Sequence, residues 1–183
     1  MSHFFKYPGI RTCFFLILSV SVFSSCQTIP DKAQAVTNFD KARYLGKWYE
    51  IARLDFKFEK DLKNTTAEYS LNEDGSIHVV NSGYDTIQLE QKQAIGKAKF
   101  VGEPTTAKLK VSFFGPFYSG YNVIAIDSAY QHALVAGKNL DYLWILSRER
   151  TLPEEVKQQY LEIAKEVGYD TNRLIWVEQD SIR

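Results

Sequence analysis

Cysteine is nearly absent from this chain: Cys13 and Cys26 are the two that occur among 183 residues. Cys13 lies in an apolar N-terminal segment, so removal of that segment would leave Cys26 as the single thiol. An internal disulfide is then excluded. Histidine is also scarce, with three in the chain, and His78 and His132 stand alone without the spacing of metal ligands. We therefore expect no metal site.

An excess of charge of either sign is missing as well. The whole chain balances 22 basic against 22 acidic side chains. Residues 26–183 carry 20 basic and 22 acidic groups, because Lys6 and Arg11 belong to the first segment. A net charge of −2 provides no basic surface for nucleic acid, which we exclude as a partner.

Known catalytic motifs are absent too. The sequence contains no Gly-x-Ser-x-Gly elbow, no His-Glu-x-x-His pair and no glycine-rich phosphate loop. We therefore predict a protein that is not an enzyme and that needs no cofactor. Aromatic residues, in contrast, make up 14% of the chain, which suits a packed β structure.

No apolar run is long enough to cross a bilayer, which takes roughly 20 residues. The longest spans residues 13–23 and is preceded by Lys6 and Arg11. The small residues Ser24 and Ser25 follow it. This order is typical of a secretory signal, so residues 1–25 are predicted to be a signal peptide. The remaining 158 residues form about one domain.

Cys26 follows these small residues directly, and the junction resembles a bacterial lipobox. Phe23 departs from the usual leucine of that motif. The resemblance implies that Cys26 receives a diacylglyceryl group and anchors the protein to a membrane through its N-terminus. Gln27 is not the aspartate that retains such lipoproteins in the inner membrane, so we expect the periplasmic face of the outer membrane. Cleavage elsewhere, with a free thiol, is the alternative. Residues 26–37 are expected to be a polar tether.

Short strands at regular spacing fill most of the remaining chain, residues 38–183. Residues 107–113 alternate between apolar and polar side chains, and Gly75 marks a tight hairpin. Eight such strands with little helix between them predict an all-β fold, an eight-stranded antiparallel up-and-down barrel. The expected strands are 48–56, 65–71, 77–80, 93–101, 107–113, 121–126, 132–136 and 142–148.

One helix is expected after the eighth strand. Thr151 and Glu154 have the spacing of a capping box, with Pro153 in the first turn, and Gly168 ends the helix. An apolar stripe should pack against the barrel wall. A short final strand is expected over residues 173–178. The stripe comprises Val156, Tyr160, Ile163, Ala164 and Val167.

Three motifs should meet at one end of such a barrel. In an up-and-down order, the start of the first strand, the turn after the sixth and the end of the eighth lie at the same end. Arg148 would then lie across the Trp48 ring and close the barrel floor. The predicted closure residues are Gly46, Trp48, Asp127, Tyr130 and Arg148.

These motifs resemble the lipocalin family. Residues 44–53, 109–118 and 141–148 are similar to the branch of that family formed by bacterial outer-membrane lipoproteins. The resemblance covers about residues 38–178 and implies a barrel that carries one small ligand. Ile126 replaces the threonine that usually precedes the second motif, Asp127 to Tyr130.

The expected ligand is a fatty acid such as palmitate, or a lysophospholipid. Side-chain alternation along the strands then predicts which residues line the cavity. Glu50 and Ala52 belong to this set if Trp48 faces inward and no bulge intervenes. The predicted ligand-binding residues are Trp144, Tyr142, Leu146, Tyr118, Phe113, Val111, Glu50 and Ala52.

Several alternatives remain open at this point. Glu50 in an apolar cup could have a raised pKa and serve a lipid-modifying enzyme. The barrel could instead be filled by side chains and act as an interaction module of the cell envelope. Lys57, Lys60 and Lys63 are either a solvated rim or a clamp for a head group. Phe117 and Tyr118 could meet the membrane or a second subunit, which would make a homodimer.

Overall fold

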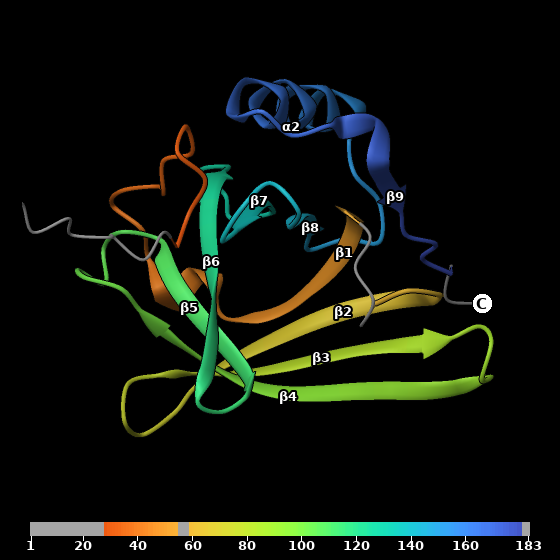
Figure 1. Ribbon diagram of the computed structural model, residues 1–183, viewed down its shortest axis with the longest axis horizontal. Coiled ribbons are helices and arrows are strands. Elements are labelled where there is room, and N and C mark those ends of the chain that lie inside the picture. The colour runs from red at the N-terminus through yellow and green to blue at the C-terminus, as the bar shows by residue number, and fades with distance from the viewer. Residues whose placement is uncertain (1–27, 55–58, 181–183) are drawn as a thin grey trace, which may run out of the picture.

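The computed structural model describes residues 28–54 and 59–180, and their main element is one antiparallel sheet closed into a barrel (Figure 1). A short helix and a longer one accompany the sheet. The strands are β1 Gly46–Leu54, β2 Leu62–Leu71, β3 Ile77–Asp85, β4 Glu90–Phe100, β5 Lys108–Phe114, β6 Phe117–Ile126, β7 His132–Gly137, β8 Leu143–Ser147 and β9 Leu174–Trp176. The helices are α1 Lys41–Tyr44 and α2 Glu154–Val167, with a 3-10 turn at Thr171–Arg173.

Consecutive strands are hydrogen-bonded neighbours from β2 to β8, and β1 pairs with both β8 and β2. This pairing closes the ring and removes its free edges. The predicted eight-stranded barrel is therefore confirmed. Because β1 rises from Gly46, the floor lies at Gly46 and the mouth lies at Leu54.

The hairpins at the mouth extend further than the sequence pattern indicates. β3 continues to Asp85 and β4 begins at Glu90, although alternation of apolar residues stops well before that turn. Their ladder still runs unbroken from Ile77 to Asp85. β6 likewise begins at Phe117, four residues earlier than expected. Backbone pairing continues there without a buried face, so the side-chain pattern does not report it.

Two hydrophobic clusters lie on the two sides of the barrel wall. The inner one gathers around Trp48 and Tyr69, and the outer one lies between strands β1, β7 and β8 and helix α2. The predicted stripe of α2 does pack on the wall, where Tyr160, Ala164 and Val167 are buried (Figure 1). The Tyr160 hydroxyl also donates to the His132 carbonyl at 2.9 Å.

The expected capping box of α2 is wrong. Pro153 occupies the N-cap and makes no side-chain capping bond, and its carbonyl accepts from Lys157 N at 3.0 Å. Thr151 lies two residues before the cap, and its carbonyl accepts from the Ser147 hydroxyl. The C-terminal prediction is confirmed: Gly168 has φ of 114° and donates to the carbonyls of the last turn.

Residues 28–37 differ from the expected tether, because they pack against the barrel. Pro30 and Ala33 are buried. Val36 N donates to the Val123 carbonyl at 2.9 Å, and the Val36 carbonyl accepts from Ala107 N at 2.8 Å. These backbone bonds hold the segment against β6 and against the residue that precedes β5. Among the described residues, no helix has the length and apolar character needed to span a membrane.

Candidate ligand-binding site

The barrel floor is built around Trp48 and Arg148. Trp48 is fully buried, and the Arg148 guanidinium carbon lies 3.8 Å from the centroid of its ring. Gly46 has φ of +90°, a conformation that disfavours a side chain, and a Cβ there would lie 3.5 Å from Arg148 Nη1. Arg148 also donates to five backbone carbonyls at 2.7–3.3 Å, those of Arg43, Tyr44, Leu45, Lys47 and Tyr130.

The turn after β6 completes this floor. The Asp127 carboxylate accepts from the backbone N–H groups of Ala129, Gln131 and His132. Partial burial opposes ionisation, but these hydrogen bonds outweigh it and lower the pKa of Asp127. The Tyr130 hydroxyl accepts from Asp40 N at 2.8 Å. The five predicted closure residues thus lie together at one end of the barrel.

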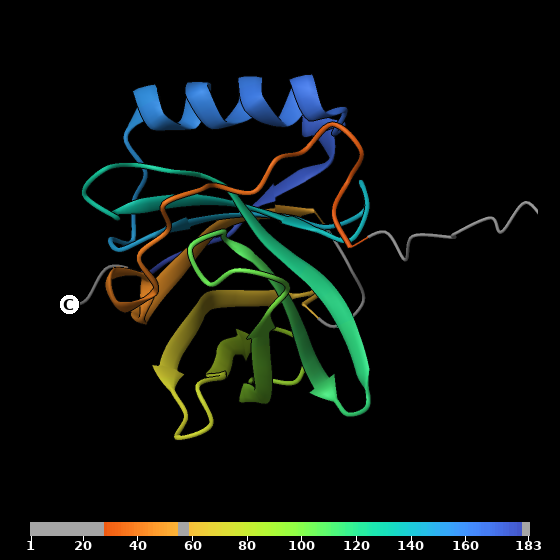
Figure 2. The same ribbon diagram turned by 90° about the vertical axis from the view of Figure 1, so that its left-hand side faces the viewer.

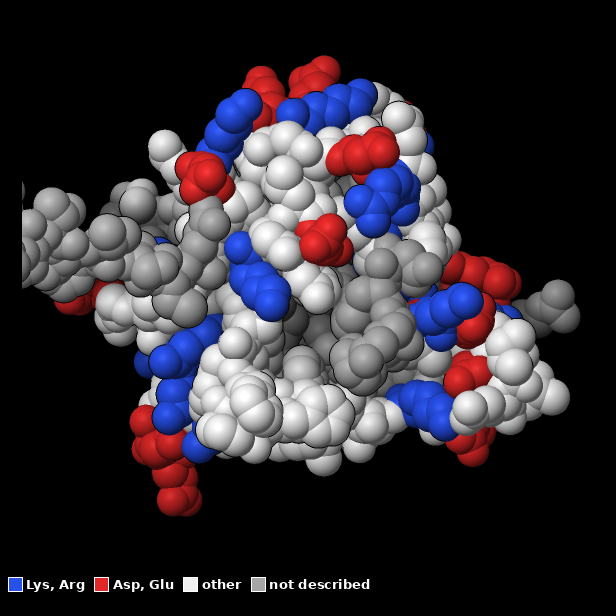
Figure 3. Space-filling model, in the orientation of Figure 1, with Lys and Arg blue, Asp and Glu red and all other residues white. Residues whose placement is uncertain are grey.

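Above the floor lies a cavity of about 640 Å³ that opens at the mouth. Figure 3 shows the opening as a hollow in the surface. Its volume is in the range of small-molecule sites, so the structure does not have the filled barrel that the sequence left open as an alternative. Seven of the eight predicted ligand-binding residues line it, namely Trp144, Tyr142, Leu146, Tyr118, Phe113, Val111 and Glu50.

Ala52 was predicted to line the cavity, and the structure places it elsewhere. It is fully buried in the outer cluster, against the side of the barrel that α2 covers. The pairing of β1 with β8 shifts register between Glu50 and Ala52. A bulge adds one residue to a strand, so side chains beyond it change faces. The alternation that begins at Trp48 therefore ends at Glu50.

A buried ion pair occupies the cavity wall on β1. Glu50 Oε1 lies 2.7 Å from Arg53 Nη1 and also accepts from the Thr65 hydroxyl at 3.3 Å. Burial raises the pKa of Glu50, while Arg53 opposes that shift. Arg53 further donates to the carbonyls of Glu59 and Leu62, so it ties β1 to the start of β2. Sequence reasoning missed Arg53, because two of its partners, the carbonyls of Glu59 and Leu62, lie beyond β1.

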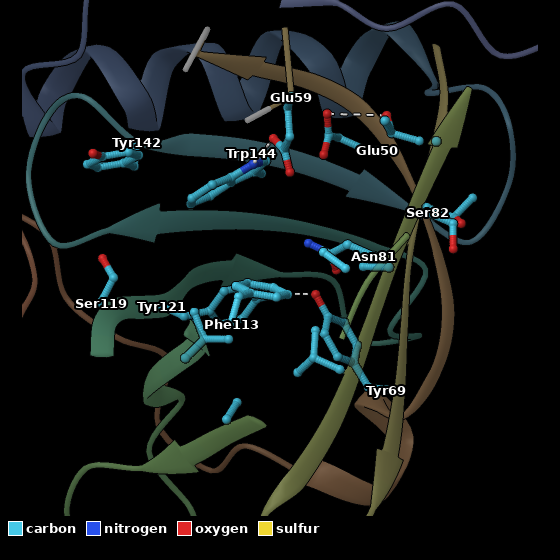
Figure 4. A pocket seen from close by; sticks show the side chains of 18 of the residues that line it. Glu50, Glu59, Tyr69, Asn81, Ser82, Phe113, Ser119, Tyr121, Tyr142 and Trp144 are labelled. Atoms are coloured by element: carbon cyan, nitrogen blue, oxygen red, sulfur yellow. Dashed lines mark hydrogen bonds between the residues drawn. The ribbon is translucent and has the colours of Figure 1, made fainter. Parts of the chain in front are cut away.

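Glu59 is a second acid in the upper cavity. Its Oε2 accepts from Trp144 Nε1 at 3.1 Å, as Figure 4 shows. Burial, reinforced by the nearby Glu50 charge, raises the pKa of Glu59 to about 8. Glu59 is therefore mostly protonated at neutral pH. The upper cavity thus contains a neutral acid beside the indole.

Three tyrosine hydroxyls form a cluster deep in the cavity, which sequence reasoning missed. The Tyr121 hydroxyl lies 2.6 Å from that of Tyr44. It lies 2.8 Å from that of Tyr69, a contact that Figure 4 shows. All three residues line the cavity. Strand alternation could have placed Tyr69 and Tyr121 on the inner face, but Tyr44 lies in α1, outside any strand pattern.

The mouth combines lysines with exposed apolar side chains. Lys60, Lys92 and Lys138 line the opening. Lys63 does not line it, and its Nζ lies 3.4 Å from Asp180 Oδ2. Lys57 and Cys26 fall outside the described residues. Four apolar side chains at two mouth hairpins are largely exposed: Ile87 73%, Leu89 70%, Phe114 70% and Phe117 79%.

Comparisons with known proteins agree with this geometry. A family model for the lipocalin-like domain matches residues 39–179. The outer membrane lipoprotein Blc of Citrobacter freundii is 56% identical over 158 residues, 86% of this chain and 89% of that protein. Blc of Escherichia coli K12 is 54% identical over 158 residues, which again cover 86% of this chain and 89% of that protein.

Solved structures show the same fold at lower identity. Insecticyanin of the tobacco hornworm Manduca sexta has a TM-score of 0.65 at 23% identity, covering 80% of this chain and 84% of its own. Lobster apocrustacyanin A1 has a TM-score of 0.64 at 18% identity, covering 84% and 94%. The family match, the closed barrel and the Trp48–Arg148 floor together establish that this chain belongs to the lipocalin family.

Proposed function

We propose that this protein is a membrane-anchored lipocalin that binds a fatty acid or lysophospholipid for lipid storage, transport or envelope maintenance. The observation that carries this proposal is the cavity of about 640 Å³, closed at the floor by Trp48 and Arg148 and lined mainly by apolar side chains. An acyl chain would occupy the barrel, with its head group at the mouth, beside Lys60, Lys92 and Lys138.

Burial of an acyl chain in the cavity provides enough free energy for binding. A sixteen-carbon chain gains roughly 13 kcal/mol on burial, at about 0.8 kcal/mol for each carbon. Immobilisation of the ligand and ordering of side chains offset several kcal/mol. A net binding free energy of about −8 kcal/mol corresponds to micromolar affinity.

The proposed location is the periplasmic face of the outer membrane. The signal-like residues 1–25 and the lipobox-like junction at Cys26 support it. Relatives 48–56% identical to this chain are named outer membrane lipoproteins, including that of Vibrio cholerae. Lipidation of Cys26 would be measured as added diacylglyceryl and acyl mass on the mature N-terminus, and an unmodified N-terminus would contradict the anchor.

Ligand binding is tested on the mature protein held in nanodiscs of fixed lipid composition. Addition of palmitate or a lysophospholipid should change Trp fluorescence saturably, because Trp144 lines the cavity. Trp144→Phe should remove the response, and Trp176→Phe, which alters an exposed residue, should retain it. Absence of a saturable response with either lipid, together with native mass spectra free of bound lipid, would refute the proposed function.

A further inference from the structure

The tyrosine cluster at the floor of the cavity has more hydrogen-bond donors than it uses. Its three hydroxyls carry three protons, but the structure contains two contacts between them, Tyr44 to Tyr121 and Tyr121 to Tyr69. Each contact uses one proton. Whichever way the hydroxyls rotate, one O–H is left without an acceptor inside the cluster.

That remaining proton lies deep in the cavity, where a ligand can reach it. Tyr44 and Tyr69 are 2% and 6% exposed, and their rings stack with centroids 5.5 Å apart. All three tyrosines border the cavity, together with apolar neighbours such as Ala98 and Leu109. Asn81 also lines the cavity, but its Oδ1 accepts no hydrogen bond from the cluster. A ligand that displaces water from the cavity leaves this donor without an acceptor unless it supplies one, so a bound oxygen atom at this depth would be stabilised.

We infer that the cluster of Tyr44, Tyr69 and Tyr121 is a polar subsite for a neutral oxygen on the distal part of a bound acyl chain, such as a hydroxyl or keto group. This inference rests on the proposed lipid-binding function and specifies its ligand class. The chain enters tail first, its head group stays near the mouth lysines, and the distal oxygen accepts the remaining tyrosine proton. A hydroxyl ligand can also donate back to a tyrosine oxygen.

A neutral oxygen fits this subsite better than a carboxylate. One available donor is too few for a desolvated anion, which needs several hydrogen bonds or a cation close by. Arg148, the cation below the floor, already donates to five backbone carbonyls. The ligand's carboxylate therefore belongs at the mouth, and the deep subsite selects for oxygen on the tail.

The experiment compares palmitate with 16-hydroxypalmitate. Mature protein in nanodiscs is equilibrated with an equimolar mixture, and native mass spectrometry gives the ratio of the two bound ligands. A purely apolar floor would reject the distal hydroxyl. We expect the protein to bind the hydroxylated chain within about threefold of palmitate, because the cluster replaces the lost water contact.

The triple variant Tyr44→Phe, Tyr69→Phe, Tyr121→Phe removes all three hydroxyls while preserving shape, so it leaves no orphan group in the cluster. It should still bind palmitate but lower the bound ratio of 16-hydroxypalmitate to palmitate by about tenfold. Tyr49→Phe, which packs against the outer cluster and does not line the cavity, is the matched control and should leave the ratio unchanged. Partition into the nanodisc lipid is common to all variants, so it cancels in this comparison.

Three results are distinguishable. Palmitate binding with an equally low ratio in the parent protein and the triple variant would overturn the subsite and spare the proposed function. Failure of the parent protein to bind either ligand would overturn the function itself. If the triple variant does not fold, the parent protein alone decides: 16-hydroxypalmitate should bind better than 8-hydroxypalmitate, and the reverse order contradicts the subsite.

A second inference concerns orientation and rests on a separate observation, the place where the N-terminal segment meets the barrel. The Thr28 carbonyl accepts from Asn122 Nδ2 at 2.8 Å and lies so close to Gly120 that a Cβ there would be 1.9 Å away. Figure 2 shows this start of the described chain at the same end as the β5–β6 hairpin and the β7–β8 turn. That end is the mouth.

The position of Thr28 limits where the anchor can be. Two residues of chain span at most about 7 Å, at about 3.6 Å per residue, so an anchor two residues before Thr28 cannot lie far from the mouth. A lipid on Cys26 would therefore hold the mouth close to the bilayer. The exposed side chains Ile87, Leu89, Phe114 and Phe117 lie at the same end, as do the cavity lysines.

We propose that the mouth faces the bilayer surface and that the tips of the β3–β4 and β5–β6 hairpins enter the lipid interface. The exposed apolar side chains at the two tips match the acyl-chain region of the interface. Asp85 and Glu90 flank the β3–β4 tip, and Lys92 pairs with Glu90, so apolar contact rather than positive charge carries the proposal. This inference rests on the proposed lipid anchor at Cys26. It would let a lipid pass between membrane and cavity without crossing bulk water.

The test places a tryptophan at either end of the lipidated protein. Phe117→Trp reports the mouth, and Leu71→Trp reports the floor, where Leu71 is also exposed, at 50%. In nanodiscs containing brominated lipid, we expect bromine to quench the added fluorescence at position 117 several-fold more than at position 71. Equal quenching, or quenching at 71 alone, would overturn the orientation. If the protein is a dimer and the tryptophan at position 117 is not quenched, the hairpin tips would contact a second copy of the chain instead of the membrane.

Discussion

At the floor of the barrel, Arg148 covers the Trp48 ring and donates to five backbone carbonyls, whereas at the mouth Phe114 and Phe117 are mostly exposed. The floor is therefore fixed by contacts within the protein. The mouth contains apolar surface and ionisable groups whose environment changes when a ligand or membrane arrives. We infer that residues of the floor mainly determine stability, while residues of the mouth mainly determine binding.

The first prediction tests the floor, where substitutions should have the largest effects on stability. Arg148→Ala leaves five carbonyls without this donor and removes the contact with Trp48, so the free energy of unfolding should fall by about 3 kcal/mol. Arg150→Ala is the matched control, because Arg150 lies 4.9 Å from the Tyr49 ring and donates to the Asp180 carbonyl on the surface. It should cost under about 1 kcal/mol. Similar losses in urea unfolding would contradict the special role of the floor.

The same contrast explains what the sequence could predict. Floor residues follow from strand order and alternation, because Trp48 and Arg148 start and end neighbouring strands. Ala52 could not be placed correctly, since the bulge after Glu50 depends on pairing with β8 rather than on local composition.

Contacts that cross loops were equally invisible to the sequence. Arg53 donates to the Glu59 carbonyl, and Trp144 donates to the Glu59 carboxyl group. The segments that contain these residues share no periodic pattern. The capping box failed for a local reason, because Pro153 occupies the N-cap in place of Thr151. Residues 28–37 have no strand-like alternation, yet the Val36 N–H bonds to β6 and the Val36 carbonyl bonds to Ala107, just before β5.

An intermediate effect concerns the upper cavity and depends on pH. Glu59 has a folded-state pKa of about 8, above its ordinary value of 4.5, so between these values the folded state holds more protons than the unfolded state. Stability should therefore fall as pH rises from 5 to 8, by about 1 kcal/mol per pH unit. Glu59→Gln should flatten this slope in urea unfolding. The pKa of Glu50 is raised as well, so part of the dependence of stability on pH should remain in this variant.

A control for this pH dependence is Glu154→Gln on α2. Hydrogen bonds from Gln158 and Lys157 lower the pKa of Glu154, so its contribution is already complete above pH 4.5. The slope between pH 5 and 8 should not change in this variant. An unchanged slope in Glu59→Gln as well would show that Glu59 ionises normally and would weaken the electrostatic contrast between mouth and floor.

The smallest expected effect is at the rim. Phe117→Ser should change the free energy of unfolding by under about 0.5 kcal/mol, because the ring is already exposed to water in the folded protein. Phe39→Ser, its buried counterpart near Tyr44 and Tyr130 at the floor, should cost about 3–5 kcal/mol through loss of packing. A loss of several kcal/mol for Phe117→Ser would mean that the rim supports the fold, so the division between a stabilising floor and a binding mouth would fail. A small loss combined with weaker retention of fluorescent lysophospholipid would sharpen that division, because the same ring would then serve binding without serving stability.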